Sequence, residues 1–243
     1  AFAKLLHLFS DPPIVRGVED VPAKGPLLLT CNHPGTVDTA VLLSSVPRPD
    51  TKIISGYTPY TDNLVHIRKH LIYSTTDAHQ RMSVVRESIR HLKDGGCLLL
   101  YPAGALEPDP AIIPGAIDYM KFWHRSVEIF VKRVPDIVVS PIVASHILLP
   151  RFYNHFIARM RKQQKDRQRA AEMLQIVSAI INRDKNALTP RVTFGKGFTL
   201  EDLNQNVEGE GLFDSIKQIS ADLMEQHVAS FDHEHPPLRI AAA

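Results

Sequence analysis

The sequence contains little cysteine, and none of it is spaced for a metal or redox centre. Cys31 and Cys97 are its only cysteines, and each lies in an apolar, strand-like run. We therefore expect two buried, reduced thiols. A zinc site would need three or four ligands at compact spacing. The nearest candidate, the His-Glu-His run at 233–235, lies in a proline-rich tail with no further ligand close by, so we expect no metal.

Long apolar runs and a strong excess of charge are missing as well. No run reaches the roughly 18 apolar residues of a membrane span. The net charge of +2 is too small to indicate nucleic acid, which would call for a concentrated basic face. The run AFAKLLHLF at residues 1–9 is too short for a signal peptide, and it fits either a surface helix on a bilayer or a first helix packed on the core.

Motifs of several enzyme classes are also absent. The chain has no G-x-S-x-G nucleophile elbow, no P-loop and no dinucleotide fingerprint. A cysteine nucleophile stays open as an alternative, because Cys31 and His33 are two residues apart. However, Cys31 ends an apolar run and is expected to face the core.

The apolar pattern alternates between strands and helices, which predicts an α/β fold. Strand-like runs lie at residues 13–18, 26–31, 51–55, 96–102, 136–145 and 191–196. Helical patterns lie at residues 79–93, 153–184 and 212–228. No linker divides the strands into two sets. We therefore predict a single domain over 1–243, a layered sheet flanked by helices, with a motif-bearing core at about 13–200 and a closing helix at 212–228.

The run LLLTCNHPGTVD places His33 just after a predicted strand and Asp38 at the start of a predicted helix. Pro34 and Gly35 make a tight turn, and Thr36 is the expected N-cap of that helix. The turn can bring the imidazole and the carboxylate within hydrogen-bond reach. A carboxylate on one ring nitrogen leaves the other nitrogen as a base for a hydroxyl proton. The alternative is a strand-edge histidine bonded to a neighbouring aspartate without catalytic use.

A second strand runs into a similar turn in GGCLLLYPAGALEPD, where Pro102 and Gly104 follow Tyr101. Backbone N–H groups at such a turn can hold an anion or the head group of an acyl acceptor. An ordinary exit from a strand into a loop explains these residues equally well.

The blocks NHPGTVD, LLLYPAG, VVSPIVAS and VTFGKGF follow one another in an order and spacing that resemble the PlsC-like glycerolipid acyltransferases. This family comprises glycerol-3-phosphate and lysophosphatidic acid acyltransferases. His33 and Asp38 fall on its His-x4-Asp motif, and Tyr101, Pro102 and Gly104 fall on its Phe-Pro-Glu-Gly motif. The resemblance covers about residues 13–200 and implies a glycerol-3-phosphate acyltransferase-like fold.

The resemblance also implies an activity. A fatty acyl group would pass from acyl-CoA or acyl-carrier protein to a hydroxyl of a lipid acceptor, such as a lysophospholipid or a glycerophosphate. His33 would be the general base, oriented by Asp38. We expect no cofactor beyond the thioester co-substrate. Asn32, beside the base, joins the motif residues Tyr101, Pro102 and Gly104 as a candidate for substrate binding.

Two departures from the family concern the acceptor. The glutamate of Phe-Pro-Glu-Gly is replaced by Ala103, and an arginine that grips the acceptor phosphate in the family aligns with Thr75. Losing a guanidinium removes a bidentate phosphate clamp. Arg68 lies near in sequence and is a candidate to replace it, although a solvated helix end explains Arg68 as well. An altered acceptor pocket is the resulting hypothesis.

The basic run ARMRKQQKDRQR at 158–169 carries six Lys or Arg residues against one acid, Asp166. Anionic lipid head groups attract such a segment, but a solvated helix face has the same composition. With the family resemblance, it suggests a peripheral protein on the cytoplasmic face of a membrane. Two other functions stay open: a non-catalytic lipid or acyl-carrier-binding relative, and an acyl thioesterase that uses the same base to activate water.

Overall fold

The computed structural model describes residues 6–7, 9–56, 65–74, 77–182, 188–206 and 211–232. Its centre is a seven-stranded sheet in the order β1-β7-β6-β2-β5-β3-β4. The strands are β1 (Ile14–Arg16), β2 (Leu27–Cys31), β3 (Lys52–Gly56), β4 (Leu71–Ser74), β5 (Cys97–Leu100), β6 (Val138–Ser145) and β7 (Arg191–Phe194). Neighbouring strands are parallel except β6 and β7, which are antiparallel. The predicted α/β sheet flanked by helices is confirmed.

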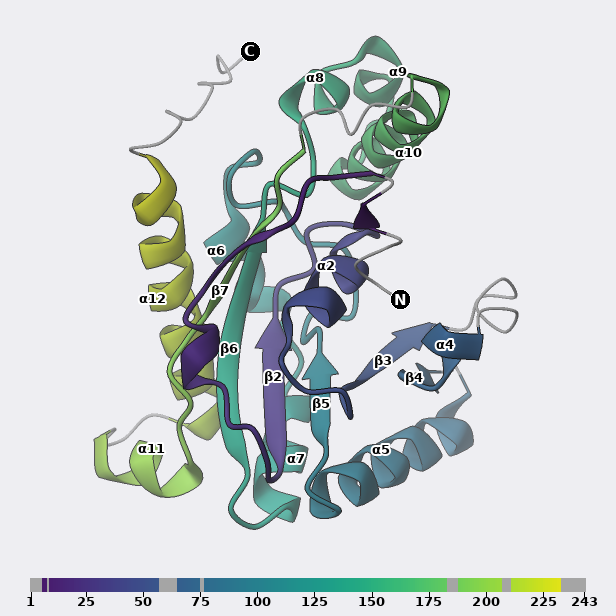
Figure 1. The fold of residues 1–243 in the computed structure, drawn as a ribbon. Helices are drawn as coiled ribbons and strands as arrows, with labels where there is room; N and C mark the ends of the chain where they lie inside the picture. The colour runs from purple at the N-terminus through teal and green to yellow at the C-terminus, as the bar shows by residue number, and fades with distance from the viewer. Residues whose placement is uncertain are drawn as a thin grey trace.

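Helices cover both faces of the sheet (Figure 1). They are η1 (Val18–Asp20), α2 (Asp38–Ser45), α4 (Val65–Arg68), α5 (Ala78–Lys93), α6 (Ala116–Tyr119), η2 (Met120–Phe122), α7 (Ser126–Arg133), α8 (Pro150–Tyr153), α9 (Phe156–Arg159), α10 (Gln164–Asn182), α11 (Leu200–Asn206) and α12 (Leu212–Asp232). Among the residues that the structure describes, no helix has the length and apolarity to cross a membrane.

The core consists of two apolar layers, one on each side of β2. Leu27 and Leu29 point to one face, where they pack in a cluster with Val41 of α2. Leu28 points to the opposite face and belongs to a cluster with Phe130 of α7. Successive side chains of a strand alternate between faces, so the continuous apolar run of β2 is that of a central strand buried on both sides.

Two sequence expectations need correction. The described part of the predicted helix at 153–184 is not continuous: it contains the last residue of α8, then α9 and α10, with breaks at residues 154–155 and 160–163. Arg167 helps to hold this arrangement, since its Nε donates to the carbonyl oxygen of Tyr153 at 3.0 Å. Strand β4 was not expected at all. The His-Glu-His run at 233–235 lies outside the described residues.

Candidate active site

The site lies at the carboxyl end of β2, where the chain leaves the sheet between its two parallel neighbours, β6 and β5. Asn32 makes this exit rigid. Its side-chain Nδ2 donates to the carbonyl oxygen of Ala144 at 2.9 Å, and its Oδ1 accepts from the Ala144 N–H at 2.9 Å. The amide is almost fully buried. These two bonds engage both ends of the Asn32 amide with β6, so Asn32 shapes the loop that carries His33, and its part in substrate binding stays a prediction.

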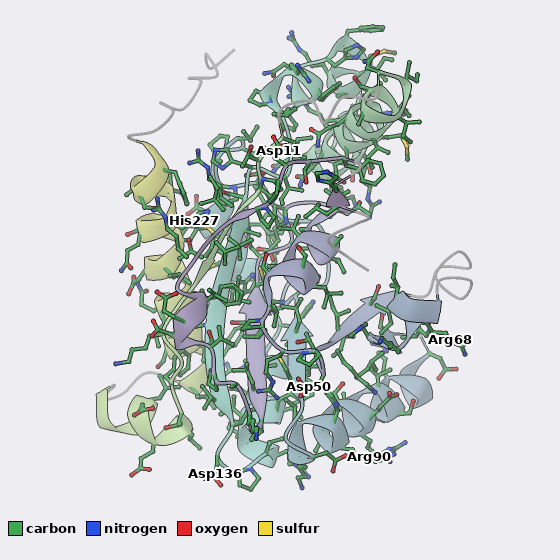
Figure 2. The ribbon with its side chains drawn as sticks, in the orientation of Figure 1. Asp11, Asp50, Arg68, Arg90, Asp136 and His227 are labelled. Carbon is green, nitrogen blue, oxygen red and sulfur yellow. The ribbon has the colours of Figure 1, made fainter. Side chains whose placement is uncertain are left out.

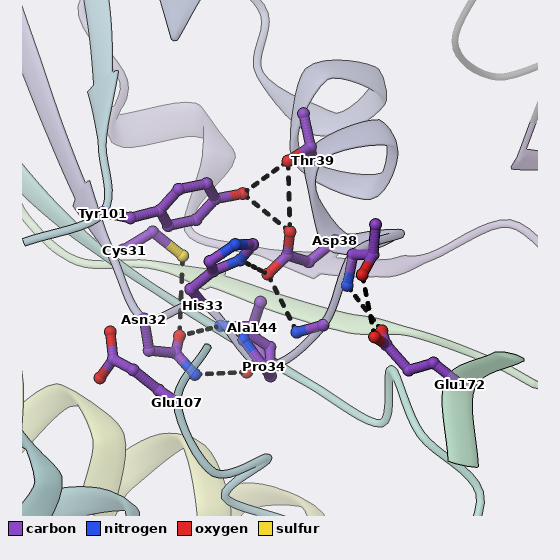
Figure 3. Close-up of polar contacts among 12 residues, drawn as sticks. Cys31, Asn32, His33, Pro34, Asp38, Thr39, Tyr101, Glu107, Ala144 and Glu172 are labelled. Carbon is purple, nitrogen blue, oxygen red and sulfur yellow. Dashed lines mark hydrogen bonds and ion pairs between the residues drawn. The ribbon is translucent and has the colours of Figure 1, made fainter. Parts of the chain in front are cut away.

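The turn after Asn32 brings His33 and Asp38 together, as the sequence pattern predicted. The distance from His33 Nδ1 to Asp38 Oδ2 is 2.8 Å (Figure 3). Asp38 is the first residue of α2 and is fully buried, whereas the His33 side chain retains 22% of its exposure. The carboxylate therefore holds one ring nitrogen from inside the protein, while the imidazole reaches the surface.

Asp38 is held by further donors. The Tyr101 hydroxyl donates to Asp38 Oδ1 at 2.9 Å, and the Thr39 hydroxyl lies 3.3 Å from the same oxygen. The Gly35 N–H donates to Oδ2 at 3.3 Å. These donors fix the orientation of the carboxylate.

Burial is the largest effect and lowers the pKa of His33, but the charge and hydrogen bond of Asp38, with the charges of Glu107 and Glu172, together raise the pKa above its usual value. A raised pKa makes the neutral imidazole a stronger base. Tyr101 adds a stacking contact, because its ring lies 4.1 Å from the His33 ring at an interplanar angle of 15°. His33 is thus bonded on one edge and stacked on one face, which limits how the ring can turn.

Tyr101 comes from the second predicted turn, immediately after β5. The Gly104 N–H donates to the Tyr101 carbonyl oxygen at 3.0 Å, and Gly104 has a φ of 61°, a value that favours glycine. The Pro102 carbonyl oxygen accepts from the His124 N–H at 2.9 Å. Of the predicted substrate-binding residues in this turn, Tyr101 reaches the dyad, while Pro102 and Gly104 shape the loop that carries it.

Helix α10 supplies the support that the sequence reasoning missed. Glu172 accepts from both the backbone N–H and the hydroxyl of Thr36, at 2.6 and 2.9 Å. Thr36 was the expected N-cap of α2, but the N-cap is Val37, without a side-chain cap, and the Thr36 hydroxyl turns to Glu172 instead. A Cβ on Gly35 would collide with Glu172 and Ile147, so only glycine fits there. Glu172 lies 136 residues from Thr36, and no local pattern in the sequence signals this contact.

Buried acids follow the second turn. Glu107 is 1% exposed, its N–H donates to the His33 carbonyl oxygen at 2.7 Å, and its Oε2 accepts from Trp123 Nε1 at 3.1 Å. Burial raises the pKa of Glu107 to about 7 and that of Glu172 to about 7. Asp109 accepts four backbone N–H bonds, three of them from residues 146–148, and burial raises its pKa to about 6. The run LEPD beside the second turn was the signal available for Glu107 and Asp109 in the sequence.

A family model for acyltransferases matches residues 13–145, which is more than half of the chain and includes both turns of the site. The chain belongs to the acyltransferase family. No curated protein sequence matches it significantly. Among solved structures, it is similar to the 1-acyl-sn-glycerophosphate (LPA) acyltransferase PlsC from Thermotoga maritima. The TM-score is 0.53 at 14% identity, over 94% of this chain and 76% of that one. At this identity the likeness shows a PlsC-like fold.

Arg68, the residue considered for a phosphate clamp, does not lie at the dyad of this acyltransferase. Arg68 ends α4 and is exposed, at the edge of the sheet where β4 lies three strands from β2 (Figure 2). The structure therefore does not bring Arg68 to His33, and its role in substrate binding stays a prediction. Thr75 lies outside the described residues. Ala103 is buried in an apolar cluster with Trp123 and Met224.

Proposed function

We propose that this acyltransferase moves a fatty acyl group from an acyl thioester to a hydroxyl of a lipid-type acceptor, such as a lysophospholipid or a glycerophosphate. The observation that carries the proposal is the His33–Asp38 pair at 2.8 Å, with the carboxylate fully buried and the imidazole partly exposed. In this arrangement Asp38 fixes the ring on Nδ1 and leaves Nε2 facing a substrate.

The alternative of a cysteine nucleophile loses its support. Cys31 is fully buried, and burial, followed by the charges of Asp38 and Glu107, raises the pKa of its thiol well above the usual value. A thiol in this state is not a nucleophile at neutral pH. The acceptor hydroxyl would therefore attack the thioester directly, without a covalent acyl-enzyme.

The step balances with one base. His33 Nε2 takes the proton of the acceptor hydroxyl while the hydroxyl oxygen attacks the thioester carbonyl carbon. The carbon–sulfur bond then breaks, and the thiolate leaves and receives the proton from the imidazolium. Asp38 stabilises the imidazolium in between. No cofactor enters this scheme. The donor is acyl-CoA or acyl-carrier protein, and Ala103 in place of the family's glutamate favours an acceptor pocket that differs from that of typical members.

The test is incubation of the purified protein with labelled palmitoyl-CoA and a mixed lipid extract, beside the His33→Ala variant. A labelled lipid that disappears in the variant supports the proposal and identifies the acceptor. Release of free fatty acid without acceptor, also dependent on His33, would support the thioesterase alternative. If neither palmitoyl-CoA nor palmitoylated carrier protein is consumed, the proposed transfer is refuted, and a non-catalytic lipid or acyl-carrier-binding protein is the alternative that stays.

A further inference from the structure

Helices α9 and α10 expose large apolar side chains that the core does not use. Phe156 of α9 is 68% exposed, and Met160, the C-cap residue that follows α9, is 76% exposed. On α10, the exposed apolar residues recur every three or four positions; they are Met173, Val177, Ile180 and Ile181. Residues at this spacing share one face of a helix. An exposed apolar face of this kind marks a surface that binds a partner or a membrane.

The same stripe of α10 begins with cations. Lys165 and Arg169 are exposed and precede Met173 at steps of four residues, so they lie on its side of the helix. Residues 150–182 contain seven Lys or Arg residues and only two acids. Of those acids, Asp166 is half-buried, and Glu172 is buried against the loop of the dyad. The exposed side of α9 and α10 is therefore apolar and cationic.

Not every basic residue of this segment faces outward. Arg167 turns inward, since its guanidinium donates to the Tyr153 carbonyl oxygen and to Asn154 Oδ1, both at 3.0 Å, and stacks over the Tyr153 ring at 4.0 Å. Arg167 fastens α8 to α10. We call the exposed apolar and cationic surface the α9–α10 face. It consists of Phe156, Met160, Lys165, Arg169, Met173, Val177, Ile180 and Ile181, and Arg167 is not part of it.

The α9–α10 face lies on the same part of the protein as the dyad. Helices α8, α9 and α10 gather beyond the carboxyl ends of β2 and β5 (Figure 1). The inner side of α10 holds the dyad loop, because Gln168 donates to the Pro34 carbonyl oxygen and Glu172 accepts from Thr36. One helix thus supports the catalytic loop on one side and exposes the apolar, cationic stripe on the other.

We propose that the α9–α10 face docks the protein onto the surface of an anionic membrane. Apolar side chains enter the interface between head groups and acyl chains, and the cations pair with anionic head groups. A second copy of the chain fits this surface less well, because a two-fold interface would set the same cations against each other with few acids to pair them. The proposal extends the proposed function, since a lipid acceptor lies in a membrane, but it rests on observations independent of the dyad.

The test is cosedimentation of the protein with vesicles of phosphatidylcholine and phosphatidylglycerol, compared with phosphatidylcholine alone. Binding should require phosphatidylglycerol and weaken with salt. The double variant Lys165→Gln/Arg169→Gln should lower the affinity for these vesicles about 30-fold, since each cation near an anionic surface contributes about 1 kcal/mol. The matched control is Arg86→Gln/Arg90→Gln on α5, which has the same spacing and charge change at another face and should leave binding unchanged.

The apolar part is tested by Met173→Asp, with Met82→Asp on α5 as its control, because both methionines are exposed on helices, at 61% and 55%. Met173→Asp should reduce vesicle binding by about tenfold or more, and Met82→Asp should not. Equal effects of test and control variants, or no binding to anionic vesicles, would overturn the proposal. Loss of binding to acidic acyl-carrier protein, with vesicle binding unchanged, would assign the face to a protein instead. Because His33→Ala should bind vesicles normally, failure of acyl transfer and failure of docking are separate results.

Discussion

Asp38→Asn tests whether His33 acts as a general base that is oriented by the charged carboxylate of Asp38. Asparagine is close in shape, and its side-chain oxygen can still accept from His33 and Gly35. Its amide can donate to the hydroxyls of Tyr101 and Thr39, which accept as well as donate. The fold should therefore survive. What disappears is the negative charge that stabilises the imidazolium when His33 takes the acceptor proton.

The size of the effect follows from the distance. Opposite charges about 4 Å apart at an effective dielectric of about 20 interact by about 4 kcal/mol. If the transition state realises most of this energy, the rate falls about 10³-fold. That value lies within the contribution of about 10² to 10⁴ typical of a general base. The loss should appear in kcat of acyl transfer, measured with labelled acyl-CoA and the acceptor that the labelling experiment identifies.

The pH profile adds a second readout. Wild-type activity should rise with pH as His33 loses its proton, because only the neutral imidazole accepts one. Burial is the largest single effect and lowers the pKa of His33, but the charge and hydrogen bond of Asp38, together with the charges of Glu107 and Glu172, raise it above the usual value. In Asp38→Asn the rise should therefore shift to lower pH, although the maximal rate is reduced. Tyr101→Phe is the control, since it keeps the charge and the stacked ring and removes one donor to Asp38. An Asn variant that kept more than about a tenth of the activity, with an unshifted profile, would refute the dyad mechanism.

Three further predictions concern the support of the dyad. Gly35→Ala should destabilise the protein and reduce activity, because the added Cβ collides with Glu172 and Ile147; unchanged denaturant unfolding would contradict this. Glu172→Gln should lower the free energy of unfolding by about 1–3 kcal/mol, since the amide offers one acceptor oxygen for the two Thr36 bonds; thermal melts measure the loss, and Glu172→Ala, which removes both bonds, should lose more. The unfolded carboxyl of Glu107 titrates near 4.5 and the folded one near 7, so the folded protein binds the extra proton and its stability should fall as pH rises between these values. Glu107→Gln should flatten this part of the pH–stability curve, and a curve identical to wild type would count against the raised pKa.

Much of the fold could be predicted from periodicity. The runs of β2 and β5 are buried throughout and apolar except for Thr30, and central parallel strands buried on both faces favour this pattern. Strand β4 escaped prediction because it is short, lies at the edge of the sheet and is only partly buried. The break between α9 and α10 also left no local mark, since no glycine or proline occurs at 160–163. Tertiary contacts set that break: Ala158 of α9 and Ala171 of α10 are buried in one cluster.

In the site, too, contacts set by the local sequence could be predicted, and contacts set by tertiary packing could not. His33 and Asp38 are five residues apart, so a turn and a helix start were enough to predict their contact. Tyr101 lies 63 residues from Asp38, and the resemblance to a family motif marked its position but not its hydroxyl bond. Glu172 was marked neither by a local turn nor by a family motif. Its contact depends on how α10 packs against the loop, which only the folded chain reveals.

Position 103 shows why a departure from a motif cannot be interpreted from the motif alone. Ala103 lies in an apolar cluster with Trp123, and the indole N–H of Trp123 is engaged by Glu107. A glutamate at position 103 would enter this cluster near an acid that burial already raises to a pKa of about 7. Two buried carboxyls that share one region raise each other's cost of ionisation. The alanine at 103 and the buried Glu107 are therefore compatible with each other, and we expect a glutamate at 103 to be tolerated better when Glu107 is replaced by glutamine.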